Sequence, residues 1–219
     1  MMRGIDRMKK ILMVITAAVL LGFLVYQGSM AFFHSETQVG AKISAGNLGI
    51  DLVENVEGTN AVKTDKGFQI ATAMPGDEIK NAVYVKNVKD NTLYVRVTAT
   101  KYWEDENGNK LPEADASLIK FKTNDLQDWI IIDDAENSNS EVVYFYYKKP
   151  IKSDTSSSNL IDSVMIDPKL EDKQYAKYRI NLNFDAEAVQ SYQGKDAILS
   201  EWGAEIVTDA NGNIVSVED

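Results

Sequence analysis

The residue types that hydrolytic enzymes need are scarce in this chain. It contains one histidine, His34, and no cysteine. A zinc protease commonly needs a histidine pair such as H-E-x-x-H, and a serine triad needs a histidine beside its nucleophile. The sequence also has no G-x-S-x-G segment and no glycine-rich phosphate loop. This composition leans away from an enzyme and predicts no cofactor, while the identity of any bound metal ion stays open.

Two short segments carry residue types that bind calcium. Residues 105–109 and 209–213 both follow the pattern D-x-N-G-N. Neither is followed by the glutamate that completes an EF-hand loop at the required spacing. Because Asn-Gly is a strong signal for a tight hairpin turn, these segments are predicted to be turns.

The charge of the chain excludes several classes of partner. Residues 32–219 hold 19 basic and 32 acidic residues, which gives a net charge of −13. Such a charge repels DNA, RNA and anionic lipid, so no nucleic-acid partner is expected. An acid pair of the glycosidase type remains open, although solvated surface carboxylates explain this number of acidic residues more simply.

Residues 1–31 have the pattern of an export signal. A basic start is followed by residues 11–26, which are almost wholly apolar and shorter than the roughly 20 residues of a bilayer span. The small residues Ser29 and Ala31 lie where a signal peptidase cuts, so cleavage is predicted after Ala31. The alternative is an uncleaved anchor. In both cases the rest of the chain lies outside the membrane. With cleavage, the chain meets the membrane only during export.

The elements that would position any functional residue are mainly strands. Alternation of apolar and polar residues predicts them at 47–53, 68–72, 79–85, 92–103, 118–122, 129–133, 141–148, 175–190, 204–207 and 213–217. Short helices are expected at 112–117 and 196–202, and a flexible polar loop at 152–159. Many short strands predict an all-β, two-sheet jelly-roll sandwich with short helical or loop insertions.

One predicted strand has no polar face. Residues 142–147 read V-V-Y-F-Y-Y, so apolar or aromatic side chains point to both sides of the sheet. Such a strand needs cover on both faces or a partner at an interface. A monomeric surface adhesin that binds its ligand through Tyr144–Tyr147 is therefore one hypothesis.

The segment that signal removal would expose is competent to form a strand. Its apolar or small face is made by Phe33, Ser35, Thr37, Val39, Ala41 and Ile43. Residues 32–46 are predicted to be an N-terminal donor-strand arm, with the jelly-roll domain at 47–219. Such an arm can add as a strand to a neighbouring copy and build an open filament. The alternative, that it pairs within its own domain, stays open here.

Several short motifs, in order along the chain, resemble the TasA/camelysin family. The stretch from Ala31 to Leu52, with S-A-G-N-L-G-I-D-L at its end, is similar to the start of the mature proteins. P-G-D at 75–77, followed by V-Y-V-K-N at 83–87 and Y-V-R-V at 94–97, resembles the central block. The stretch F-D-A-E-A-V-Q at 184–190 is similar to the closing strand, while Asn47 replaces the usual threonine.

This resemblance implies a secreted structural protein with a jelly-roll fold. It implies a signal removed by a dedicated peptidase of the SipW type, and fibres of the extracellular biofilm matrix formed by N-terminal strand donation. The partner would be the protein itself or a related matrix subunit. The alternative implied by the same resemblance is a camelysin-like cell-surface metalloendopeptidase, although the sequence offers no recognisable zinc-binding set.

Overall fold

The structure is a computed structural model that describes residues 43–45, 48–55, 60–71, 74–133, 140–170 and 173–218. Contacts divide the chain into two compact units, residues 1–34 and residues 35–219. All the described residues belong to the second unit. The predicted signal peptide at 1–31 therefore lies outside the described residues.

Two large antiparallel sheets form the body of this unit. The first has five strands in the order β1-β2-β5-β10-β7. Their bounds are β1 Ile43–Ala45, β2 Leu48–Asn55, β5 Glu78–Asn87, β7 Ile119–Lys122 and β10 Ile161–Ile166. The second has six strands in the order β3-β4-β11-β6-β9-β8. Their bounds are β3 Ala61–Lys63, β4 Gly67–Ile70, β6 Leu93–Glu104, β8 Trp129–Asp133, β9 Val142–Tyr147 and β11 Arg179–Gln190.

The chain passes back and forth between these sheets. From β2 onward it visits the second sheet at β3 and β4, the first at β5, the second at β6, and so on until β11. One apolar core receives side chains from both sheets, among them Val83 and Val85 of β5 and Val95 and Val97 of β6. The prediction of an all-β fold is confirmed.

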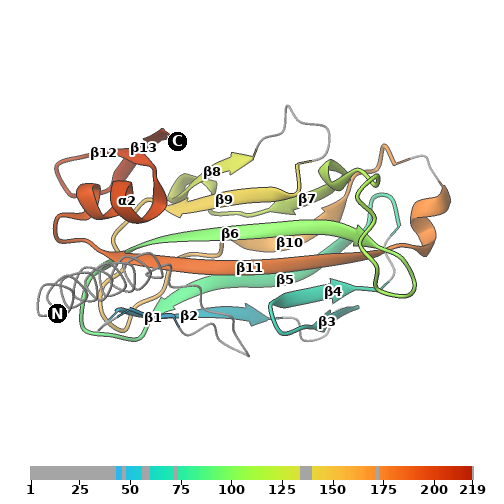
Figure 1. The fold of residues 1–219 in the computed structure, drawn as a ribbon, viewed down its shortest axis with the longest axis horizontal. Coiled ribbons are helices and arrows are strands. Elements are labelled where there is room, and N and C mark those ends of the chain that lie inside the picture. Colours follow the sequence, from blue (N-terminus) through green and yellow to red (C-terminus); the bar gives the residue numbers. More distant parts are fainter. Residues whose placement is uncertain are drawn as a thin grey trace, which may run out of the picture. The chain divides into compact units, whose positions relative to one another are not determined.

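The longest pair of strands forms the middle of the second sheet. β6 and β11 pair from Leu93↔Gln190 to Glu104↔Arg179, and they run side by side in Figure 1. Along β11, buried and partly buried residues alternate from Ile180 to Ala186, as period-two patterning requires. Both strands were predicted from that alternation.

A C-terminal module, which we define as residues 194–218, covers the outer face of the second sheet near β8 and β9. It consists of the helix α2 (Gly194–Trp202) and the hairpin β12 (Glu205–Thr208) and β13 (Ile214–Glu218). A second apolar cluster joins the module to the sheet and includes Tyr94, Tyr146, Ile198 and Trp202. A side chain at Gly194 would meet the Tyr94 ring at 2.4 Å, so glycine permits this close approach.

The differences from the predicted elements have local causes. β10 was missed because a bulge between Ile161 and Ser163 breaks its alternation, and β3 because it has three residues. Residues 173–177 form the 3₁₀ helix η3 rather than the start of β11. Helix was expected at 112–117 and 196–202. The structure has a 3₁₀ helix η1 at Ala116–Leu118, and α2 begins at Gly194.

The polar run at 152–159 is not the free loop that was predicted. Asn87 donates its backbone N–H to Thr155 O at 2.9 Å, and Ser157 donates to Val85 O at 2.8 Å. The hydroxyl of Ser157 also accepts a hydrogen bond from Val85 N. Serine hydroxyls and the backbone itself provide these bonds, so a run without apolar residues still hydrogen-bonds along β5, beyond the start of β10.

Candidate assembly surface

The predicted arm is only partly described by the structure. Its residue Ile43 begins β1 and pairs with Ile50 of β2 in the same chain. The other arm residues, Phe33, Thr37, Val39 and Ala41, lie outside the described residues. So do His34 and the predicted cleavage residues Ser29 and Ala31. The structure therefore tests neither the arm before residue 43 nor the cleavage site.

Residues 43–45 pair within their own subunit. The ladder runs Ile43↔Ile50, Ser44↔Gly49 and Ala45↔Leu48, which is a tight hairpin across the expected boundary between arm and domain. β1 is also the first strand of the five-stranded sheet, so its other side faces no strand of that sheet. Any segment available for donation is therefore confined to residues 32–42, which lead directly into an edge strand.

The four outermost strands of the two large sheets are β1 and β7, and β3 and β8. Proteins commonly protect such edges from pairing with other chains by charged residues, lysine above all. β7 carries Lys120 and Lys122, and the three-residue β3 carries Lys63. β8 has the sequence W-I-I-I-D and no lysine. Of the three edges whose side chains are described, β8 is the least protected.

The backbone of β8 presents hydrogen-bonding groups to a side on which no described strand pairs with it. Lys148 N donates to Asp128 O at 2.9 Å, just before the ladder that pairs Ile130 with Tyr146 and Ile132 with Tyr144. Because antiparallel bonds alternate along a strand, the N–H and C=O groups of Ile130 and Ile132 face β9. The C=O of Trp129 and the N–H and C=O groups of Ile131 and Asp133 face the open edge, while the N–H of Trp129 donates to Leu126 O at the end of η2.

A cavity of about 110 Å³ lies beside this edge. It opens between β7 of one sheet and β8 of the other, where the facing sheets end. Its lining combines apolar and charged side chains: Lys101, Lys120, Phe121, Thr123, Leu126, Ile131, Asp133, Val143, Phe145 and Leu160. Leu126 is 61% exposed and Ile131 37% exposed. Apolar surface therefore continues from the cavity to the solvent.

A buried lysine lines the cavity and joins the two sheets. Lys101 of β6 is 2% exposed, and its Nζ donates to Ile119 O of β7 at 3.0 Å. The same Nζ lies 3.6 Å from Asp133 Oδ2 of β8 and 5.5 Å from the centre of the Phe121 ring. Burial lowers the pKa of Lys101, and the nearby Asp133 carboxylate offsets this only in part.

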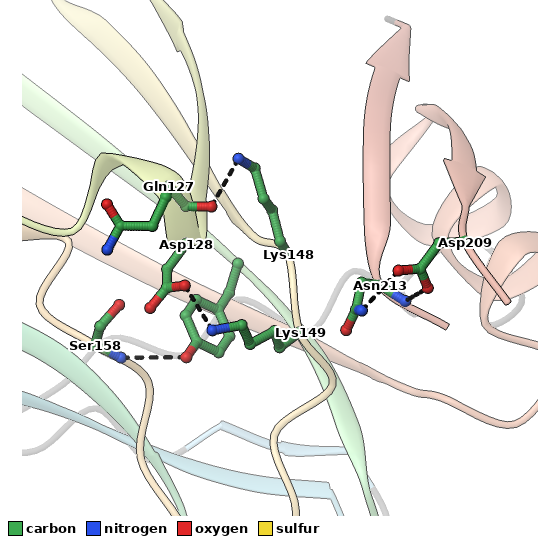
Figure 2. Close-up of polar contacts among 8 residues, drawn as sticks. Gln127, Asp128, Lys148, Lys149, Ser158, Asp209 and Asn213 are labelled. Atoms are coloured by element: carbon green, nitrogen blue, oxygen red, sulfur yellow. Dashed lines mark hydrogen bonds and ion pairs between the residues drawn. The ribbon is translucent and has the colours of Figure 1, made fainter. Parts of the chain in front are cut away.

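The start of β8 is held firmly by the end of β9. The 3₁₀ helix η2 (Leu126–Asp128) precedes β8, and Figure 2 shows two lysines reaching it. Lys149 Nζ lies 2.6 Å from Asp128 Oδ1, and Lys148 Nζ donates to Gln127 O at 2.8 Å. The ammonium of Lys149 lowers the pKa of Asp128. The open edge of β8 therefore belongs to a strand with an anchored start.

The aromatic strand β9 is covered on both faces within the chain. Phe145, Tyr146 and Tyr147 are buried, because Phe145 and Tyr147 face the inter-sheet core and Tyr146 faces the C-terminal module. The adhesin hypothesis needed Tyr144–Tyr147 as an exposed patch and is wrong on this point. The alternative expectation, that such a strand needs cover on both sides, is confirmed.

The cover on the outer face is built around Arg96. Its guanidinium lies 5.2 Å from the centre of the Trp202 ring and 5.5 Å from that of Tyr144. It donates from Nε to Glu187 at 2.8 Å and from Nη1 to Trp202 O at 3.2 Å. Burial disfavours its charge, but contacts with Tyr146 and Glu187 outweigh this and raise the pKa of Arg96.

The two D-x-N-G-N segments are turns, as predicted, and have the same geometry. Asp105 Oδ1 accepts the N–H groups of Asn107 and Asn109 at 2.8 Å, and Asp209 Oδ1 accepts those of Asn211 and Asn213 at 2.8 Å. The side-chain amides of Asn109 and Asn213 donate to the Oδ2 atoms; Figure 2 includes the second turn. These bonds lower the pKa of Asp105 and Asp209.

Within the described ranges, no group of three or more histidine, cysteine, aspartate or glutamate residues could hold a metal ion. No described helix has the length and apolar character of a membrane span.

Sequence reasoning missed the two features that distinguish the β8 edge. Lys101 falls in the apolar register of β6, between Ala99 and Trp103, and a lysine at such a position signals a buried charge. The absence of lysine from 129–133 is also visible in the sequence. However, only the sheet order shows that this strand is at an edge.

Comparison with protein-family models, with curated proteins and with solved structures finds no match for this chain.

Proposed function

We propose that this protein is exported and forms or joins extracellular fibres by donating its N-terminal segment as a strand to another subunit. The observation that carries the proposal is the position of β1. Residues 32–42 alternate in character and continue directly into β1, an edge strand of the five-stranded sheet. Such a segment can leave the sheet in extended conformation and pair elsewhere through its main chain.

The proposed fold is a jelly roll of the TasA/camelysin type. The repeated crossing of the chain between two facing antiparallel sheets supports it, as does the neighbouring order β4-β11-β6-β9 in the second sheet. The ordered motifs at 75–77, 83–87, 94–97 and 184–190 support the family resemblance. No described residue cluster favours the metalloendopeptidase alternative.

The proposal of assembly is tested by removing the arm while keeping the hairpin. A protein that starts at Phe32 is compared with one that starts at Ile43, so that β1 can still pair with β2. We expect fibres in electron micrographs from the longer protein, and a folded monomer from the shorter one. Equal assembly by both proteins would contradict strand donation by residues 32–42. Circular dichroism confirms that the shorter protein is folded.

Export is tested separately. The full chain, expressed in a host that has a dedicated signal peptidase of the proposed type, should appear outside the cell with Phe32 at its N-terminus. Amino-terminal sequencing of the extracellular protein measures this directly. Retention of residues 1–31 on a membrane-bound product would favour the anchor instead.

A further inference from the structure

We infer that the open edge of β8 accepts residues 32–42 of a second copy of this chain, with the apolar face of that arm over the cavity between β7 and β8. This inference rests on the proposed function and names the acceptor for it. The backbone groups of Ile131 and Asp133 and the C=O of Trp129 point to the open edge, and β8 lacks the lysines that protect β3 and β7. Strand addition uses such backbone groups for affinity.

The side chains beside the edge fit an arm with two unlike faces. A strand added to β8 would direct alternate side chains toward the inter-sheet side, as Trp129, Ile131 and Asp133 are directed. There they would meet the cavity of about 110 Å³, which is lined by Phe121, Phe145 and Ile131. The small or apolar face of the arm suits this side. The arm's other face, with His34, Glu36 and Gln38, suits solvent.

The length of the arm favours a second copy over the same chain. β1 and β7 are the first and last of five strands, so they are about 19 Å apart at roughly 4.8 Å per spacing. β8 belongs to the facing sheet, about 10 Å farther. An arm that pairs about five residues with β8 keeps about six, which span at most about 20 Å when extended. The arm of the same chain is therefore too short to reach β8. The arm of a neighbouring copy does not have to cross this distance.

The absence of cysteine from the sequence makes this contact directly testable. Ile131→Cys is combined in turn with Thr37→Cys, Val39→Cys and Ala41→Cys in the protein that starts at Phe32. The control replaces Ile131→Cys by Val62→Cys, at the opposite edge of the same sheet, where Val62 is 62% exposed. Each protein assembles under reducing conditions and is then oxidised and run on a non-reducing gel.

We expect a ladder of covalent multimers with at least one Ile131→Cys pair and none with Val62→Cys. A disulfide-linked monomer would show that the arm folds back on its own β8, and would overturn the inference. Fibres without any cross-link at position 131 would place the acceptor at another edge and leave the proposed function standing. Failure of the parent protein to form fibres would overturn both.

A second variant probes the backbone of the edge itself. Ile131→Pro removes an N–H that points away from β9, so the β8–β9 ladder keeps its bonds. The matched control is Lys63→Pro in β3. Thr64 N donates a hydrogen bond to Gly67 O of β4. Because such bonds alternate along an antiparallel pair, the N–H of the preceding residue, Lys63, points away from β4. We expect Ile131→Pro to abolish fibres and Lys63→Pro to retain them, with both proteins folded by circular dichroism. Fibres from Ile131→Pro equal to those of the control would contradict the acceptor assignment.

Discussion

The two faces of β6 each carry a cation with little exposure to solvent: the side chain of Lys101 is 2% exposed and that of Arg96 13% exposed. Lys101 points into the space between the sheets, where it finds Ile119 O and, at 3.6 Å, Asp133. Arg96 points to the opposite face, where Glu187 and three aromatic rings surround it. Burial lowers the pKa of Lys101, whereas the contacts of Arg96 raise its pKa in spite of burial.

This difference separates the two cores of the unit. The inner core is held by apolar burial. The buried charge of Lys101 is a cost there, and this side chain lines the cavity between β7 and β8. The outer core is a junction between the sheet and the C-terminal module. Its arginine contributes to holding that junction together, because the planar guanidinium can stack on rings and hydrogen bond in its plane at once.

The largest loss of stability is expected for a substitution in the inner core. Trp103 is 0% exposed, packs edge-on against Tyr175 at 4.9 Å and donates from Nε1 to Asp115 O. Trp103→Ala should lower the free energy of unfolding by about 4 kcal/mol, because it leaves a large cavity. Urea unfolding followed by circular dichroism measures this. A loss as small as that of an exposed substitution such as Val62→Ala would mean that the inner core is not the main source of stability.

An intermediate effect is expected for the cation on the outer face. Arg96→Met keeps much of the side-chain volume but removes the ring stacking and the bonds to Glu187 and Trp202 O. It should destabilise the protein by about 2 kcal/mol. Hydrogen exchange should speed up first in residues 194–218. Exchange that speeds up equally in all strands would show that the module is not a separate cooperative unit.

A smaller effect of opposite sign is expected for the cation on the inner face. Lys101→Met should stabilise the protein at neutral pH by about 1 kcal/mol, because a buried charge is replaced by an apolar chain of similar length. With Lys101 present, the unfolded state holds more protons between the lowered folded-state pKa and the ordinary 10.5, so stability rises with pH in that window. The advantage of methionine should therefore shrink as the pH is raised. Destabilisation by Lys101→Met at pH 7 would show that its bond to Ile119 O outweighs burial.

The smallest changes in stability are expected for substitutions in the two D-x-N-G-N turns. Asp105 and Asp209 have folded-state pKa values below 3.8, so each contributes stability that is present above 3.8 and lost as the pH falls through the folded value. Asp105→Ala and Asp209→Ala should lower the melting temperature at pH 7, and the difference from the parent should shrink as the pH falls below 3.8. Because Asp209 belongs to the C-terminal module, its variant should also loosen residues 194–218 in hydrogen exchange. A difference from the parent that does not shrink as the pH falls would assign the effect to something other than the carboxylate.

The sequence by itself determined the strands whose faces differ and the turns whose residues are specialised. The alternation along 92–103 and 175–190 predicted β6 as far as Trp103 and the whole of β11, because a pleated strand half buried in a core must alternate. The two Asn-Gly turns followed from local backbone preferences. Neither kind of signal depends on which strands become neighbours.

Only the tertiary structure decided which strands are edges and what covers each face. Whether W-I-I-I-D is central or exposed depends on sheet order, to which segments far apart in sequence contribute. The cover over β9 comes from residues more than 40 positions later, and the buried state of Lys101 depends on β7 and β8. Such long-range pairings leave no local periodicity in the chain, because the contacts that settle them are made between segments rather than within them.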